Sequence, residues 1–278
     1  MKLITLISFL ATAVFAQGPL TPPGEPAPTM KTLDEIHSKV AAVGERRTPI
    51  SALPFTISAG GSYYLTGNLT SAGGDGITVT AGNVTIDLNG FAMLGAVGGR
   101  GITFAGIGDV RILNGSLRDW GTAIESLNST RTLVEKVNVN ECTTGAIVTT
   151  GPNCTVRDCT ISFCGGHGIR VTEGAVVTGN VVRSSFNSGI RVEGINCEVR
   201  GNTIYNSTVG VELLSNRACV EGNSMKANTL GLRVVSSVNS IRRNSLANNG
   251  GNTIFAGNDV APFEPAATSI NPHANISY

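Results

Sequence analysis

The sequence contains few charged and few aromatic side chains. Charged residues make up 14% of the 278 residues, aromatic residues 5%, and the formal net charge is only +1. A nucleic-acid-binding surface needs concentrated basic charge, so the composition argues against a nucleic-acid partner. The chain has three histidines and no grouped cysteine and histidine residues at surface positions. The sequence therefore predicts no metal site and no cofactor.

Long hydrophobic runs are absent after the first sixteen residues. Lys2 precedes an apolar run that ends in Val14-Phe15-Ala16, a small-residue cleavage context, so residues 1–16 are predicted to be a signal peptide. Residues 17–30 are rich in proline and are predicted to form an extended spacer. No other stretch approaches the roughly 20 apolar residues of a membrane span. We expect a secreted, periplasmic or cell-surface protein.

One short phrase, apolar-x-Gly-Asn-x-apolar, recurs about every twenty-one residues. A second phrase, Gly-apolar-x-apolar, follows each copy at a fixed distance. Such self-similarity is typical of a solenoid, in which each unit covers the apolar face of its neighbour. The clear copies of the first phrase begin at Val156, Val177, Val199, Val220 and Ile241, and those of the second at Gly168, Gly189, Gly210 and Gly231.

The spacing within each unit favours strands over helices. Apolar residues alternate in short runs rich in valine and isoleucine, with glycine or asparagine between the runs. Each unit is therefore predicted to be one coil of an all-β, single-stranded parallel β-helix of about eight or nine coils over residues 55–256. An irregular cap is expected over 257–278. At one turn of each coil the asparagines should form a hydrogen-bonded ladder: Asn180, Asn202, Asn223 and Asn244.

A short helix is predicted over residues 31–44, ahead of the β-helix. Apolar residues recur there at helical spacing, Thr32 and Glu35 are placed to form a capping box, and Gly44 would end the helix. So short a helix must pack against something. It could cover the open edge of the first coil, or it could mediate self-association. The sequence leaves both interpretations open.

The repeat register restricts how the six cysteines could pair. Cys142 and Cys164 fall one coil apart at equivalent positions, so they are a possible disulfide, with free thiols as the alternative. Cys154, Cys159 and Cys197 are predicted to be buried thiols that act as small apolar fillers.

Alternation along the second phrase predicts an outward column of charged side chains. Arg170 would lie directly over Arg191, and two like charges about 5 Å apart repel each other. Either Glu173 and Glu193 in the following turns relieve this repulsion, or a bound anion does, such as an acidic sugar polymer. The column is the predicted ligand-binding site, and it consists of Arg170, Arg191, Glu212 and Arg233.

The repeated phrases, together with residues 84–91, resemble the right-handed parallel β-helix proteins of the pectin-lyase-like superfamily over about residues 55–256. The resemblance implies a right-handed β-helix and a carbohydrate ligand. Gly166-His167-Gly168 also resembles the Gly-His-Gly motif of the polygalacturonase branch, where the histidine lies beside paired catalytic aspartates. The preceding coils carry no acid pair here, and glycoside hydrolysis normally needs two carboxylates. His167 and Glu125 are the remaining, weak catalytic candidates.

Three functional hypotheses follow from these observations. The first is a non-catalytic surface protein whose ridged face contacts a polysaccharide or other glycan. The second is a carbohydrate-active enzyme, a polysaccharide lyase or glycoside hydrolase. The third is an attachment or tail-fibre-like module that oligomerises through the helix. We favour the first because the sequence shows neither a carboxylate pair nor the clustered carboxylates of a calcium-dependent lyase.

Overall fold

The structure is a computed structural model that describes residues 31–42, 45–254, 257–266 and 268–278. The predicted signal peptide (1–16) and spacer (17–30) lie outside the described residues. The chain divides into two units, Met1–Arg46 and Arg47–Tyr278. No helix among the described residues is long and apolar enough to cross a membrane.

The predicted N-terminal helix is present as α1 (Leu33–Ala42). The Glu35 N–H donates to Thr32 Oγ1 at 3.1 Å, and the Thr32 N–H donates to Glu35 Oε2 at 3.0 Å, which is the reciprocal pattern of a capping box. Leu33 and Ile36 are exposed. Covering of the first coil and self-association both remain predictions for this helix.

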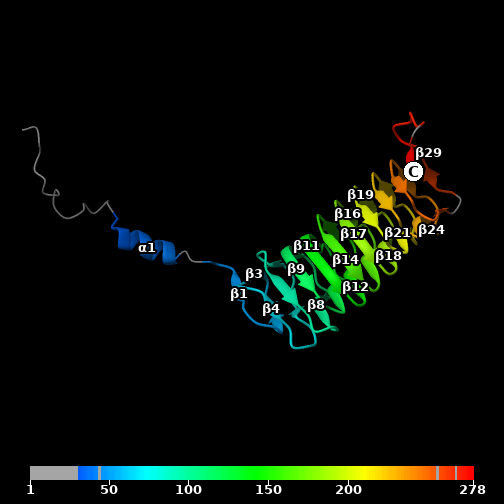
Figure 1. Cartoon of the computed structure of the whole chain (residues 1–278). Helices are drawn as coiled ribbons and strands as arrows, with labels where there is room; N and C mark the ends of the chain where they lie inside the picture. Colours follow the sequence, from blue (N-terminus) through cyan, green and yellow to red (C-terminus); the bar gives the residue numbers. More distant parts are fainter. Residues whose placement is uncertain (1–30, 43–44, 255–256, 267) are drawn as a thin grey trace, which may run out of the picture. The chain divides into compact units, whose positions relative to one another are not determined.

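The described residues between 47 and 278 form a right-handed parallel β-helix, which confirms the predicted fold (Figure 1). Neighbouring strands come from successive coils and run parallel. In the described residues they form two sheets, one of ten strands and one of twenty. The smaller sheet consists of β2 (Phe55–Ile57), β5 (Ile77–Val79), β8 (Arg100–Ala105), β10 (Thr122–Leu127), β12 (Gly145–Thr149), β15 (His167–Val171), β18 (Ser188–Val192), β21 (Val209–Leu213), β24 (Leu230–Val234) and β27 (Thr253–Ile254).

The larger sheet takes up to two strands from each coil. Its members are β1 (Thr48–Ile50), β3 (Gly61–Leu65), β4 (Leu69–Thr70), β6 (Val84–Asp87), β7 (Ala92–Leu94), β9 (Val110–Arg118), β11 (Leu133–Cys142), β13 (Thr155–Arg157), β14 (Thr160–Cys164), β16 (Val176–Thr178), β17 (Val181–Ser185), β19 (Glu198–Arg200), β20 (Thr203–Tyr205), β22 (Cys219–Glu221), β23 (Ser224–Lys226), β25 (Ser240–Arg242), β26 (Ser245–Ala247), β28 (Asp259–Val260), β29 (Phe263–Pro265) and β30 (Asn275–Ser277).

The core consists of columns of inward-pointing aliphatic side chains. A representative column is Val156, Val177, Val199, Val220 and Ile241, which lie in register on successive coils and are all fully buried. β-Branched side chains suit a pleated strand, and burying each one contributes roughly 1.5–3 kcal/mol. Because each column is completed by the next coil, the coils stabilise one another.

The Gly-Asn pair of each repeat forms the turn between the two strands that a coil contributes to the larger sheet. Gly179, Gly201 and Gly222 have φ angles of 67°, 62° and 65°, a left-handed conformation that glycine adopts without a steric penalty. The asparagine that follows each glycine is buried. The turn therefore explains why glycine and asparagine recur in the phrase. The glycine allows the left-handed backbone conformation, and the asparagine side chain hydrogen-bonds to backbone groups at the turn.

The four asparagines of the predicted ladder lie directly above one another on successive coils, which confirms the ladder. Asn202 Oδ1 accepts hydrogen bonds from the backbone N–H and the Nδ2 of Asn180, at 2.9 and 3.0 Å. The same pattern joins Asn202 to Asn223 and Asn223 to Asn244. It continues to Asn275 in the C-terminal segment. Each side chain thus satisfies a buried backbone donor of the preceding coil.

Two further ladders run through other turns, and the sequence analysis did not single them out. In one, Asn228 Oδ1 accepts from the Ser207 N–H, and Asn249 accepts from Asn228. In the other, Asn239 accepts from the Ala218 N–H, and Asn258 accepts from Asn239.

The stack extends beyond the predicted limits of 55 and 256. At the N-terminal end β1 pairs with β3, and Ile50 of β1 is fully buried. At the C-terminal end β28 pairs with β25 and β30 pairs with β26, so part of the predicted irregular cap continues the sheet. Asn275 holds this last strand in place because it occupies the next position of the asparagine ladder.

All six cysteines are free thiols in the structure, including the possible disulfide pair Cys142 and Cys164. These two lie directly opposite each other on β11 and β14, and both are buried. Parallel stacking holds equivalent Cβ atoms at roughly the 4.8 Å strand spacing, whereas a disulfide needs about 3.5–4.5 Å. Cys154, Cys159 and Cys197 are also buried, as predicted for interior fillers.

Replacing Asn223 by alanine should lower the free energy of unfolding by about 3 kcal/mol, because buried donors of the adjoining coils lose their partners. Denaturant unfolding followed by circular dichroism measures the change. Asn187→Ala is the matched control, since Asn187 is exposed and its side-chain amide makes no hydrogen bond among the described residues. Equal destabilisation by the two substitutions would contradict a structural role for the ladder.

Candidate functional site

The predicted ligand-binding column lies on the outer face of the ten-stranded sheet. Arg170 of β15, Arg191 of β18, Glu212 of β21 and Arg233 of β24 are direct partners in the parallel register. Their side chains point outward because the residues on either side of each are core residues, such as Ile190 and Val192 around Arg191. We call these four residues, together with Glu193, the ridge.

The arginines of the ridge are joined by bridging carboxylates. Glu193 accepts from Arg170 at 2.7 Å and from Arg191 at 2.6 Å. Glu212 accepts from Arg191 at 3.0 Å and also binds Arg233. The repulsion between Arg170 and Arg191 is therefore relieved by Glu193, one of the two glutamates that the sequence analysis proposed for this role.

Glu212 is the buried centre of the ridge, with only 2% of its surface exposed. Burial alone would raise the pKa of its carboxyl group, but the hydrogen bond from Ser188 and the charges of Arg191 and Arg233 outweigh burial. The net result is a pKa below the ordinary value of 4.5. The pKa of Glu193 is lowered in the same way, against burial, by Arg170 and Arg191. Both carboxylates are therefore ionised at neutral pH.

The two weak catalytic candidates, Glu125 and His167, are not in contact with each other. Glu125 lies on β10, two strands from β15, where His167 begins the strand. Glu125 is paired with Arg100 at 3.0 Å. His167 Nδ1 accepts the backbone N–H of Ser188 at 3.2 Å, and burial together with the charge of Arg191 lowers the pKa of its imidazole.

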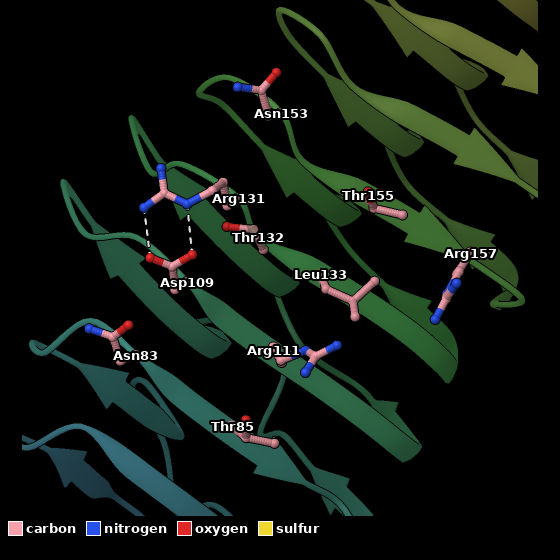
Figure 2. Close-up of a pocket in the computed structure, with 10 residues that line it drawn as sticks. All are labelled: Asn83, Thr85, Asp109, Arg111, Arg131, Thr132, Leu133, Asn153, Thr155 and Arg157. Atoms are coloured by element: carbon pink, nitrogen blue, oxygen red, sulfur yellow. Dashed lines mark hydrogen bonds and ion pairs between the residues drawn. The ribbon is translucent and has the colours of Figure 1, made fainter.

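A second concave surface lies on the twenty-stranded sheet and was missed by the sequence analysis. It is a hollow of about 640 Å³. Figure 2 shows that turn residues form one side of it and outward-pointing strand residues form the other. We call it the Arg111 hollow, and its lining includes Asn83, Asp109, Arg131 and Asn153 of the turns and Thr85, Arg111, Leu133 and Thr155 of the strands.

A periodic signal for the Arg111 hollow does exist in the sequence. Thr85, Arg111, Leu133 and Thr155 are partners in one outward column. Each of these four residues immediately precedes the apolar residue that begins the first phrase of its coil. The early coils fit the repeat only loosely, so the column is less evident in the sequence than the columns of the later coils.

The fold and these two surfaces define the protein as a β-helix with polar outer faces and an apolar interior. The model of one protein family, described as "Periplasmic copper-binding protein (NosD)", matches residues 74–271. The chain belongs to this family. It is a periplasmic β-helix protein, in agreement with the export predicted from its first residues. No curated protein matches the chain significantly.

The chain is similar to several solved structures at low sequence identity. An alginate lyase from Paenibacillus sp. is 12% identical, with 80% of this chain and 97% of that chain covered and a TM-score of 0.45. A lacto-N-biosidase from Eubacterium ramulus is 10% identical, with 76% and 60% covered and a TM-score of 0.49. The Dettilon tailspike protein is 13% identical, with 90% and 65% covered and a TM-score of 0.38.

The family description raises the question of copper, and the donor atoms of the described residues do not fit it. These residues bring together no group of three or more His, Cys, Asp or Glu side chains. His167 stands beside Arg170 and Arg191, whose charges disfavour a cation. His273 is hydrogen-bonded through Nδ1 to Arg243. Copper sites in proteins are built from several converging imidazole, thiolate or thioether ligands.

Replacing Glu212 by glutamine should lower the free energy of unfolding by about 2 kcal/mol near neutral pH, because two arginines lose a buried partner. The folded-state pKa of Glu212 lies below 4.5, so its ionised form stabilises the fold above that pH, and this contribution is lost as the pH falls through the folded pKa. The difference between wild type and variant should therefore shrink below pH 4.5.

Urea unfolding over a range of pH values measures this effect. Glu198→Gln is the control, because Glu198 is 46% exposed and has one exposed arginine partner, so it should change stability by about 0.5 kcal/mol or less. A difference for Glu212→Gln that does not depend on pH would show that the carboxylate charge is not what stabilises the ridge.

Proposed function

We propose that the protein is a non-catalytic, glycan-binding β-helix of the periplasm, and that the ridge is its binding face. The observation that carries this proposal is the continuous network from Arg170 through Glu193, Arg191 and Glu212 to Arg233. It presents guanidinium and carboxylate groups side by side along the axis of the β-helix. A sugar polymer offers hydroxyl donors and acceptors at regular intervals that suit such a row.

The internal pairing of the ridge indicates what kind of contact it makes. Because Glu193 and Glu212 already balance most of the arginine charge, the ridge is better suited to hydrogen bonding with sugar hydroxyls than to capturing an anion. Arginine has five N–H donors in a planar fork, so each guanidinium keeps donors for a ligand after binding a carboxylate. The charges of the ridge are fixed in place before a ligand arrives, which limits the entropy lost on binding.

The alternative of a carbohydrate-active enzyme has less support. Glu125 is paired with Arg100 and lies two strands from His167, so these residues do not flank one bond. Oligomerisation through α1, the third hypothesis, remains a prediction that rests on exposed Leu33 and Ile36.

The double substitution Arg170→Ala and Arg191→Ala should weaken retention by polysaccharide at least about tenfold, because the central donors of the ridge are removed. Affinity gel electrophoresis with a panel of acidic and neutral polysaccharides measures retention. The control is Arg200→Ala with Arg242→Ala, which removes two ion-paired arginines from the outer face of the other sheet. Circular dichroism should show both variants folded.

Two outcomes would contradict the proposal. Unchanged retention of the ridge variant would remove the ridge as the binding face. New reducing ends or unsaturated products, after incubation of wild type with the same panel with and without Ca²⁺, would show that the protein is an enzyme.

Equilibrium dialysis of the mature protein against Cu(II), and against Cu(I) under reducing conditions, should leave no stoichiometric copper bound, because the described donors do not converge. Metal analysis by mass spectrometry gives the ratio of copper to protein. One retained equivalent would contradict this prediction, and its loss in His167→Ala or Cys142→Ser would then identify a ligand.

A further inference from the structure

The Arg111 hollow differs from the ridge in how its charges are paired. Arg131 binds Asp109 through two hydrogen bonds of 2.7 and 2.6 Å, drawn as dashed lines in Figure 2. Arg157 binds Glu135 at 2.8 Å. The hollow is lined by three arginines, and two of them, Arg131 and Arg157, are paired with carboxylates. Arg111 is the third, and it has no directly paired carboxylate among the described residues.

Arg111 makes no hydrogen bond and no direct ion pair within the part of the chain that the structure describes, although its charge helps to lower the pKa of Glu135. Its side chain is exposed, and Figure 2 shows its guanidinium between Thr85 and Leu133, apart from the Asp109–Arg131 pair. Glu135 is shared between Arg157 and Lys136, whose Nζ lies 3.8 Å from its Oε1. All five N–H donors of the Arg111 guanidinium are therefore available to a ligand.

Other polar groups around Arg111 are also unused by the fold. The side chains of Asn83, Thr85, Asn153 and Thr155 make no hydrogen bond within the described residues. The Nε of Arg157 is buried and lacks an acceptor. This contrasts with the interior turns, where stacked asparagines satisfy their neighbours.

The size and chemistry of the hollow suit a small charged group. Its volume of about 640 Å³ falls in the range typical of ligand sites. A planar guanidinium binds carboxylate, sulfate or phosphate through two parallel hydrogen bonds. Leu133, the partner of Arg111 on the next coil, adds an apolar surface against which a ligand could pack.

We infer that the Arg111 hollow is an oxyanion-binding site, in which Arg111 holds a carboxylate, sulfate or phosphate group while Thr85 and Asn83 contact the rest of the ligand. The site goes beyond the proposed function because it lies on the other sheet and does not involve the ridge. The oxyanion has two sources, a free inorganic anion or the acidic group of a glycan.

Isothermal titration calorimetry at low ionic strength tests this inference with inorganic phosphate, inorganic sulfate, polygalacturonate and the methyl ester of polygalacturonate. Wild type should bind at least one charged probe saturably, and Arg111→Gln should weaken that binding about tenfold or more. Added salt should weaken it as well. Arg200→Gln is the matched control, since Arg200 is an exposed arginine of the same sheet that already has carboxylate partners, and it should bind as wild type does.

The probes separate the two sources. Binding of phosphate or sulfate would indicate a free inorganic anion, whereas binding of polygalacturonate alone, lost in its methyl ester, would indicate an acidic glycan. Failure of every charged probe to bind, or equal binding by wild type and Arg111→Gln, would overturn the inference. The ridge variant with Arg170→Ala and Arg191→Ala should bind inorganic phosphate or sulfate as wild type does. With polygalacturonate it should keep the part of the binding that Arg111→Gln removes, so the failure of this inference can be told apart from the failure of glycan binding by the ridge.

Discussion

The parallel hydrogen-bonded register between successive coils is the constraint on which the rest of the structure depends. A shift of one residue would turn each inward valine outward and each ridge charge inward. The buried asparagines oppose such a shift, because each side chain bonds to the coil before it and the coil after it, as Asn223 does with Asn202 and Asn244. The three asparagine ladders therefore fix the register as well as satisfying buried donors at the turns.

The sequence predicted those features that follow directly from this register. Interior columns such as Val177 over Val199, the order of the ridge and the stacking of the asparagines depend only on spacing and alternation. The N-terminal and C-terminal strands were missed because β1 and β30 pair with the stack although their segments do not repeat the phrase. The column of the Arg111 hollow follows from the same spacing, but the sequence does not show which of its arginines binds a carboxylate, because that depends on the direction of each side chain.

The two outer faces show how charge is distributed once the register is set. Equivalent residues of adjacent coils are separated by the strand spacing of about 4.8 Å, so a carboxylate between two arginines can bind both. Glu193 and Glu212 use this geometry on the ridge. Around Arg111 the neighbour in the column is Leu133, and no carboxylate among the described residues makes a hydrogen bond or ion pair with its guanidinium. The two surfaces thus differ in pairing: every arginine of the ridge has a carboxylate partner, whereas Arg111 has none in direct contact, which is why we propose an anion site only around Arg111.

The same pairing argues against acid–base catalysis on the ridge. A general acid at neutral pH needs a carboxyl group whose pKa is raised, and burial without compensating charge is the usual cause. Glu212 is buried, but its bonds to Ser188, Arg191 and Arg233 reverse the effect of burial and keep it ionised. The imidazole of His167 is neutral at ordinary pH, and its Nδ1 is already occupied by the Ser188 N–H. The interactions that stabilise the ridge therefore leave it without the proton donor that hydrolysis would require, and this is why we propose binding and not catalysis for these residues.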